Sequence, residues 1–541
     1  LGAATPAGTD VVVSQVETPT TEGGPPAWMP DTLNAEFTGK TIANESNAPA
    51  GLSSAYATAV GRDFYGSPTS IAPAITSIGA FSAGNWLGGG FLQTVPNAGG
   101  PAPNASTSRI TNHSWVGTAS NFDTWVLRRL DWLVETDETI QVVAVDNGDG
   151  ITANNLGLLA SAYNAIAVGR SDGLQLVGSA GVDATYIAGR ARPDLVDPSD
   201  STLGTTPRVA AAAALLVETG HANAALSTDP VSASVTNRAG VVVRNAERSE
   251  VIKAALMAGA DRMTHNTTSP NLAAYRGTPA NQADNGLDRR YGAGQLNVRN
   301  SYRIIAAGEQ GSTEDGNGAA TVAARGFDYD PSFGGQGGSN TTATYPLPVQ
   351  AQPALLTATL AWNLDITGPV SNDFDGTATL RDLNVELIDL ANGGALVASS
   401  NSALENTENL WLVVPANAQY ALRVTRTGSF NWDYALAWQL QPDTDADRAP
   451  NELDNCTLVS NASQCDSDGD GFGNRCDADL NNNGATNAQD ATLFRAQLGQ
   501  PSVAPAYNAA DLNCNGFVNA QDSTLFRSLL GNPPGPSGLQ P

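Results

Sequence analysis

The chain has 541 residues, of which 41% are hydrophobic, and a formal net charge of -26 at pH 7. A chain of this length is too long for one compact core, so we expect three or four structural units. The negative charge argues against nucleic acid or an anionic membrane as the partner and favours binding of divalent cations. No apolar run is long enough to span a bilayer as a helix.

The cysteines point to an oxidising compartment. All four lie near the C-terminal end, within sequence rich in Asp, Asn and Gly. Disulfides in such sequence are typical of proteins outside the cell. The chain begins with Leu1 rather than methionine, as expected after removal of a secretion signal. We therefore expect a secreted protein, extracellular or at the cell surface.

Short apolar runs alternate with helical patterns over residues 1–307. Residues 192–220 predict a short strand, a loop and a helix that is apolar on every side and begins near Pro207, because proline is favoured in the first turn. The alternation predicts an α/β domain with a parallel sheet and helices on both faces. Other buried strands are expected at residues 10–17, 109–117, 139–147 and 160–173, and other helices at 122–138 and 249–262.

Several of these segments resemble the subtilisin-like serine peptidases (subtilases). SSAYATAVG at residues 53–61, NHSW at 112–115, NAIAVG at 164–169 and TTPRVAAAAALL at 205–216 are similar to the family's base, substrate-strand, core-strand and nucleophile-helix segments. The resemblance implies a subtilisin-like fold over residues 1–307. It places the triad positions at Glu17, Tyr56 and Leu203, and the side-chain oxyanion donor at Asn147.

The residues at the three triad positions cannot perform the family's chemistry. Leucine cannot attack a carbonyl, and tyrosine, with an ordinary pKa of about 10, is a poor base at neutral pH. Hydroxyls that a displaced site could use follow nearby, at Ser201, Thr202, Thr205 and Thr206. The histidines are expected to be structural or on the surface: His113, His221 and His265. We therefore expect a catalytically inactive pseudoprotease, the alternative being an active secreted serine endopeptidase with a displaced catalytic site.

From residue 308 the pattern changes to short alternating runs separated by turn residues. Such runs at short spacing predict an antiparallel β-sandwich over residues 308–440. The segment resembles the β-sandwich that follows the catalytic domain in many secreted subtilases. The expected strands are residues 355–362, 383–390, 410–414, 420–425 and 434–440.

Residues 441–478 begin with an acidic linker that leads into the first of three loops of one design. Each loop has oxygen-bearing side chains at positions 1, 3, 5, 9 and 12 and glycine at position 6, which is the spacing by which a twelve-residue loop wraps oxygens around Ca²⁺. Position 7 contributes its backbone carbonyl. The predicted calcium ligands are Asp466, Asp468, Asp470, Phe472, Asn474 and Asp477 in the first loop, Asp479, Asn481, Asn483, Ala485, Asn487 and Asp490 in the second, and Asp511, Asn513, Asn515, Phe517, Asn519 and Asp522 in the third.

The first loop, with DNC before it, resembles a thrombospondin type 3 repeat. The other two belong to an internal repeat, D-L-N-x-N-G-x-x-N-A-Q-D-x-T-L-F-R, which resembles a type I dockerin over residues 479–532, followed by a tail at 533–541. Dockerins dock onto cohesin modules through paired helices, which implies docking faces at residues 492–498 and 524–530. The disulfide pairing stays open: a bridge between Cys456 and Cys476 would leave Cys465 and Cys514 as a second pair.

Two functions from different classes remain. In the first, the chain is an extracellular calcium-binding scaffold, assembly or partner-binding protein that docks a cohesin-like module or further copies of itself through its C-terminal module. In the second, it is the active endopeptidase. A narrower possibility is that calcium binding only stabilises the C-terminal module. Removal of calcium distinguishes docking from a purely stabilising role, because only docking predicts that binding of a partner is lost.

Overall fold

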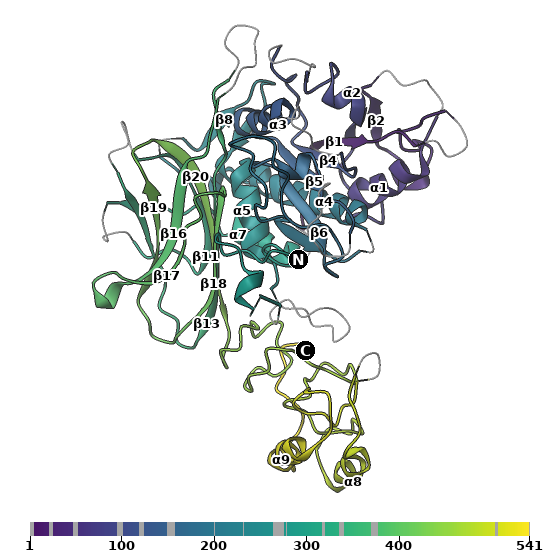
Figure 1. Cartoon of the computed structure of the whole chain (residues 1–541), viewed down its shortest axis with the longest axis vertical. Coiled ribbons are helices and arrows are strands. Elements are labelled where there is room, and N and C mark those ends of the chain that lie inside the picture. The colour runs from purple at the N-terminus through teal and green to yellow at the C-terminus, as the bar shows by residue number, and fades with distance from the viewer. Residues whose placement is uncertain are drawn as a thin grey trace.

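The computed structural model describes residues 5–20, 25–46, 52–94, 101–117, 124–148, 157–199, 201–230, 232–262, 275–276, 278–315, 320–334, 340–368, 377–503 and 507–539. A parallel-sheet domain packs beside an antiparallel sandwich, and a smaller module lies below both (Figure 1). Within the described ranges, no helix is long and apolar enough to cross a membrane.

The first domain is built on a seven-stranded sheet in the order β2-β3-β1-β4-β5-β6-β7. Every pairing in it is parallel, which confirms the predicted α/β class. Parallel strands need a crossover connection between neighbours, and helices supply most of these crossovers. The strands are β1 (Val12–Glu17), β2 (Thr41–Asn44), β3 (Ser77–Ser82), β4 (Ile110–His113), β5 (Ile140–Ala144), β6 (Ile166–Arg170) and β7 (Leu195–Asp197).

Helices cover both faces of this sheet, as the sequence predicts. Successive side chains of a strand point to opposite faces, so Val142 of β5 enters one core and Val143 the other. The core around Val142 contains side chains from α1 (Ala55–Tyr65), α4 (Thr202–Ala222), α5 (Ser249–Gly259) and α7 (Val298–Ala306). The core around Val143 contains side chains from α2 (Ala83–Leu87) and α3 (Thr124–Asp137).

Helix α4 runs through the centre of the domain and is buried on every side over residues 209–216. The expected start near Pro207 is wrong, because the helix begins at Thr202. Its first backbone N–H is capped by Oδ1 of Asn147 at 3.0 Å, a partner that lies too far along the chain for local capping rules to find. Pro207 therefore lies inside the helix, where it cannot donate the backbone N–H that would bond the carbonyl of Leu203.

The second domain contains a five-stranded sheet, β10-β12-β19-β16-β17, and a four-stranded sheet, β11-β20-β13-β18. Their inner faces form one apolar core. All five expected strands are present, and β10, β11, β12 and β17 are additional to them, as are β14 (Asp365–Ile366) and β15 (Ala378–Thr379), which pair in a separate two-stranded sheet. The strands are β10 (Thr313–Glu314), β11 (Arg325–Phe333), β12 (Thr342–Pro346), β13 (Ala354–Ala361), β16 (Asp382–Asp389), β17 (Ala395–Ser400), β18 (Thr407–Val414), β19 (Tyr420–Thr427) and β20 (Trp432–Pro442).

The two domains share a buried boundary. Helix α5 packs against β13 and β20 of the four-stranded sheet (Figure 1). The carbonyl of Ala258 in α5 accepts hydrogen bonds from Thr357 Oγ1 at 2.8 Å and Gln439 Nε2 at 3.1 Å. The sandwich therefore covers an apolar helix of the first domain and leaves it no solvent-exposed face.

The C-terminal module begins after β20 and contains α8 (Ala488–Gln497) and α9 (Ala520–Leu529). Its small apolar core is supplemented by covalent links. One disulfide joins Cys456 to Cys476 and the other joins Cys465 to Cys514, so the pairing that the sequence left open is settled. Disulfides restrict the unfolded chain, which compensates for the limited burial that a small module achieves.

Candidate functional site

Glu17, which the sequence predicts at the position of the triad aspartate, is buried at the end of β1. Glu17 Oε1 accepts a hydrogen bond from Gln15 Nε2 at 3.0 Å, whereas Oε2 is buried without a partner. Burial raises the pKa of the Glu17 carboxyl well above its usual value. A buried carboxyl with a raised pKa is poorly suited to stabilise positive charge on a neighbouring base.

Tyr56, which the sequence predicts at the position of the general base, lies on α1. Its hydroxyl donates a hydrogen bond to the carbonyl of Ser114 at 2.6 Å. Burial, together with the negative charge of Glu17, raises the pKa of Tyr56 above its usual value. Tyr56 therefore keeps its proton and donates a hydrogen bond to a backbone carbonyl, whereas a general base must accept a proton.

The loop that would carry the nucleophile leads into the first turn of α4. Leu203 lies in that turn, and its side chain is outside the described residues. Thr205 and Thr206 both donate their hydroxyls to the carbonyl of Thr202, at 2.9 and 2.6 Å. The Thr202 hydroxyl lies 3.3 Å from Asn147 Oδ1, the same oxygen that caps the helix. Three of the hydroxyls suggested for a displaced site are thus engaged by the helix start itself.

The described histidines stand apart from this helix start. His113 is buried on β4, where Nε2 lies 2.9 Å from Gln141 Oε1 and Trp115 Nε1 donates to Nδ1 at 3.2 Å. Burial lowers the pKa of His113 to about 4. His221 lies at the opposite end of α4, with Nδ1 3.5 Å from Glu247 Oε2. His265 lies outside the described residues. These contacts agree with the predicted structural and surface roles.

The three predicted calcium loops share one backbone conformation. Position 6 has a φ of +89°, +92° and +98° at Gly471, Gly484 and Gly516, and position 4 has +74°, +54° and +53° at Gly469, Asn482 and Cys514. This left-handed region favours glycine, which explains its presence at position 6. The aspartate at position 1 accepts the backbone N–H of position 6 in each loop, through Asp466, Asp479 and Asp511.

The first loop gathers the most charge. Potential ligand oxygens of Asp466, Asp468 and Asp470 all lie within 4.8 Å of one another. Burial, with the negative charges of Asp470 and Asp468 adding to it, raises the pKa of Asp477 to about 7. Such a set of oxygen donors fits a hard divalent cation. Asn474 differs from this set, because its side chain bonds Ser467 and the carbonyl of Asp511.

The second and third loops pass directly into helices. The position 9 residues, Asn487 and Asn519, are the N-caps of α8 and α9, and their side chains accept the N–H of Gln489 and Gln521 at 2.8 Å. The position 12 residues, Asp490 and Asp522, are buried and complete a capping box with them. The sequence predicted ligands at these positions and missed that the same side chains start the helices.

The position 3 asparagines differ between these two loops. Asn481 Nδ2 donates to Asp490 Oδ1 at 2.7 Å, whereas Asn513 Nδ2 donates to Gln521 Oε1 at 3.0 Å. The position 5 residues also bond within their loops, Asn483 to Asp479 and Asn515 to Asp511 through their backbone N–H groups, both at 3.2 Å. The two loops are therefore similar without being identical.

The helices that follow these loops pack against each other through equivalent residues. The rings of Phe494 and Phe526 stack with their centroids 4.8 Å apart, and both are buried. Both helices also leave side chains exposed, so the module presents two related surfaces. Exposed side chains on them include Thr492, Leu493, Arg495 and Leu498 on one unit and Thr524, Arg527, Ser528 and Leu530 on the other.

Solved structures similar to this chain include three serine proteases. The self-cleaved protease domain of PatA has 16% identity and a TM-score of 0.34, over 55% of this chain and 98% of that one. The serine protease of Aeromonas sobria has 14% identity and a TM-score of 0.30, over 80% and 89%. A cold-adapted subtilisin-like serine proteinase has 19% identity and a TM-score of 0.27, over 39% and 77%. With TM-scores this low, these likenesses carry no argument about activity.

No protein with a curated description matches the chain. The C-terminal module, in contrast, matches a family model. Residues 477–530, which contain the second and third loops and both helices that follow them, match the family model described as Dockerin type I domain, which places a dockerin at the C-terminal end of the chain.

Proposed function

We propose that this chain is a secreted calcium-binding protein that docks a protein partner through its C-terminal module, and that its parallel-sheet domain keeps a subtilase fold without a working catalytic triad. The proposal assigns the chain a role in extracellular assembly. The partner it commits to is a cohesin-like module, since dockerin domains bind cohesins. Self-association is the alternative outcome of the tests below.

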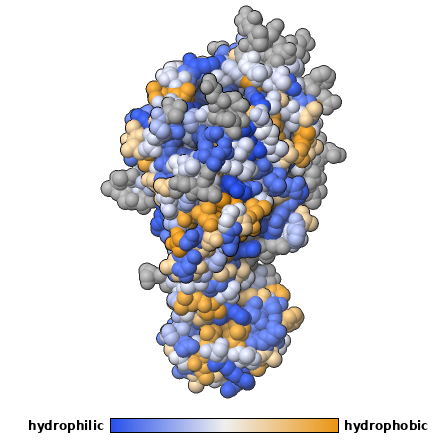
Figure 2. Space-filling model, turned by 90° about the vertical axis from the view of Figure 1, so that its left-hand side faces the viewer, coloured by the Kyte–Doolittle hydropathy of each residue, from blue (hydrophilic) through white to orange (hydrophobic). Residues whose placement is uncertain are grey.

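The single observation that carries docking is the paired arrangement of α8 and α9. Their inward faces are used by the stacked Phe494 and Phe526. Their outward faces keep apolar side chains exposed, with Leu498 45% and Leu530 51% accessible at equivalent positions. Apolar surface is visible on the module at the lower end of the molecule (Figure 2). Exposed apolar groups on a polar module are typical of a protein interface.

Calcium would act by fixing the loops from which these helices start. A bound Ca²⁺ supplies positive charge for Asp479 and Asp490 in one unit and for Asp511 and Asp522 in the other. Asp479 and Asp511 also accept the backbone N–H of position 6 in their loops, whereas Asp490 and Asp522 accept the backbone N–H of the residues that cap α8 and α9. We infer that calcium binding and the orientation of the two docking faces are coupled through them.

The contacts at the triad positions support binding rather than proteolysis. The proton of Tyr56 is committed to the Ser114 carbonyl, and Glu17 is buried. Among the described residues, no basic nitrogen is bonded to a hydroxyl of the α4 start. Serine-protease chemistry needs such a pair, so nothing here favours the endopeptidase alternative.

Docking is tested by measuring binding of the full chain to a panel of cohesin modules in calcium, with Leu498→Glu and Leu530→Glu introduced singly and together. We expect the double variant to bind at least tenfold more weakly than the natural chain, because both apolar faces then carry an unpaired charge. Leu396→Glu, at a leucine 58% exposed on β17, is the matched control and should bind normally. Failure of every cohesin to bind the natural chain, with no self-association by light scattering, would contradict the proposal.

A further inference from the structure

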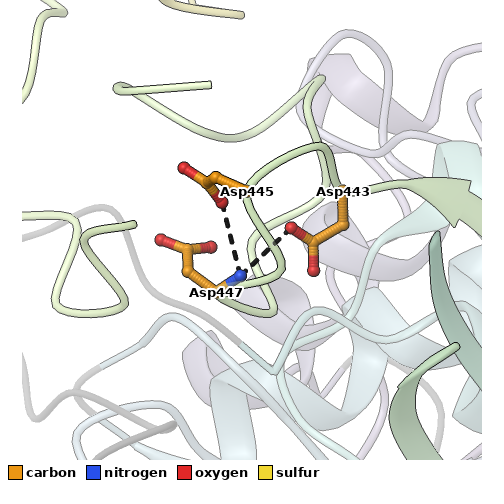
Figure 3. Close-up of side chains that lie close together, drawn as sticks. All are labelled: Asp443, Asp445 and Asp447. Carbon is orange, nitrogen blue, oxygen red and sulfur yellow. Dashed lines mark hydrogen bonds between the residues drawn. The ribbon is translucent and has the colours of Figure 1, made fainter. Parts of the chain in front are cut away.

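We propose that residues 443–454, in the segment between the sandwich and the first predicted loop, form a fourth calcium site whose side-chain ligands are Asp443, Asp445, Asp447 and Asp454. The sequence suggested only an acidic linker here. In the structure the segment folds into a tight loop directly after β20, and three aspartates turn toward one another (Figure 3). Potential ligand oxygens of Asp443, Asp445 and Asp447 all lie within 4.8 Å of one another.

The backbone of this segment repeats that of the three predicted calcium loops. Counting Asp443 as position 1, position 4 is Ala446 with a φ of +62° and position 6 is Arg448 with a φ of +78°. Asp443 accepts the backbone N–H of position 5 at 3.2 Å and of position 6 at 2.9 Å, as Asp511 does in the third loop at 3.2 and 2.9 Å. An arginine in the left-handed region is unfavourable, so the surrounding contacts must hold it there.

Two carboxylate oxygens of the segment are buried without a hydrogen-bond partner. Asp454, at position 12, is fully buried, and its Oδ1 accepts from Cys456 N at 2.8 Å and Gln464 Nε2 at 2.9 Å, whereas its Oδ2 accepts nothing. Asp445 Oδ2 is likewise buried and accepts no hydrogen bond. Gln464 Nε2 donates to Asp454 Oδ1 at 2.9 Å and to Asp447 Oδ2 at 3.5 Å, so Asp454 lies beside the other three aspartates. A free oxygen from each end of the loop is thus available to one ligand.

Within the described part of the chain, no basic side chain pairs with the negative charges of these four aspartates. Among the described residues, no Arg, Lys or His forms a salt bridge with any of the four aspartates. Arg448 is the one basic residue within the loop sequence, and its guanidinium lies 5.1 Å from the ring of Trp411. Buried charges are found paired or bound to metal. A set made only of oxygens, with four carboxylates, fits Ca²⁺.

The proposed site lies where the last strand of the sandwich leads into the C-terminal module. β20 ends at Pro442, one residue before Asp443. Asp447 Oδ2 accepts the backbone N–H of Asn461 at 2.7 Å, a residue that lies between the two cysteines of the first disulfide. An ion held by Asp447 therefore connects the last strand of the sandwich to the disulfide-linked module. We infer that calcium at this site fixes the module to the sandwich.

The test counts calcium ions on the full chain by native mass spectrometry and by equilibrium dialysis. Asp445→Asn is the first variant, because Asp445 is the least buried of the four and the hydrogen bond that it accepts from Asp447 N can also be accepted by an amide oxygen. We expect it to lower the affinity of one site at least tenfold, and Asp445→Asn with Asp447→Asn to bind one ion fewer. Asp284→Asn, at an exposed aspartate outside the loops, should bind as many ions as the natural chain.

A second measurement guards against a variant that fails to fold. Limited proteolysis of the natural chain should show cleavage within residues 443–454 that calcium slows at least tenfold, with both disulfides intact. The proposal is overturned if the double variant, folded by circular dichroism, binds as many ions as the natural chain. It is equally overturned if calcium leaves the rate of cleavage in this segment unchanged.

Discussion

Replacing Asp479 and Asp511 together by asparagine should abolish docking of the protein partner. Each residue occupies position 1 of its loop and accepts backbone N–H groups of positions 5 and 6. Each loop has only two predicted carboxylate ligands, so the change removes half the ligand charge of each site. Calcium affinity depends strongly on that charge. We expect binding to weaken at least 100-fold, or about 2.7 kcal/mol.

The measurement is calorimetric titration of the full chain with its cohesin partner at fixed calcium. Chelation of calcium from the natural chain should produce the same loss, and restored calcium should reverse it. Asp284→Asn removes one negative charge from an exposed position outside the loops and should bind normally. Docking that survives both the double substitution and chelation would show that calcium does not control the two faces.

Replacing Phe494 by alanine should unfold the C-terminal module while leaving the two larger domains intact. The ring is buried and stacks on Phe526 with centroids 4.8 Å apart, at the centre of a small apolar core. Loss of a buried phenylalanine costs about 3–5 kcal/mol, which is comparable to the whole stability that a module of this size achieves.

The matched control lies in the same module. Phe517 is 57% exposed, so Phe517→Ala removes an equal side chain with little loss of packing, and it keeps the backbone carbonyl predicted to bind calcium. Thermal unfolding of the full chain in calcium should show an early transition for Phe494→Ala and none for Phe517→Ala. Coincident unfolding of all domains in both variants would contradict an independently stabilised module.

The fold could be predicted where one local pattern decides the structure. The apolar runs of β5 and β6 and the Ala-rich α4 are buried on every side, so their patterns do not depend on distant contacts. The repeat of Asp, Asn and Gly likewise carries the loop geometry of the C-terminal module, because each position has a fixed backbone or ligand role. These features were predictable from residue type and spacing.

Other features depend on contacts between distant residues. Strand β11 contains buried Asp328 and Asp330, and Asp328 accepts a hydrogen bond from the distant Tyr345, so its pattern does not resemble a buried strand. The start of α4 depends on Asn147, which is far away in sequence. At the triad positions, residue identity indicated lost chemistry, but only the structure gives the partner of Tyr56.

The loop at residues 443–454 differs from the three predicted loops in the residue type at position 6. The three predicted loops were found by glycine at position 6, and this loop has Arg448 there. The aspartates at positions 1, 3, 5 and 12 follow the same spacing as in the first loop. The spacing of the carboxylates alone therefore predicts a calcium loop at these residues. Glycine is the favoured residue for that backbone conformation, and tertiary contacts can impose the same conformation on another residue.

We propose that this chain acts by binding and does not cleave peptides. The most direct measurement treats the purified full chain, in calcium and with its folding verified by circular dichroism, with a fluorophosphonate probe for reactive serines and with denatured casein. We expect no labelling and no casein hydrolysis above the buffer rate, because Tyr56, predicted at the base position, donates a hydrogen bond to the carbonyl of Ser114. Labelling at Ser201 or a neighbouring hydroxyl, together with hydrolysis of casein, would contradict it.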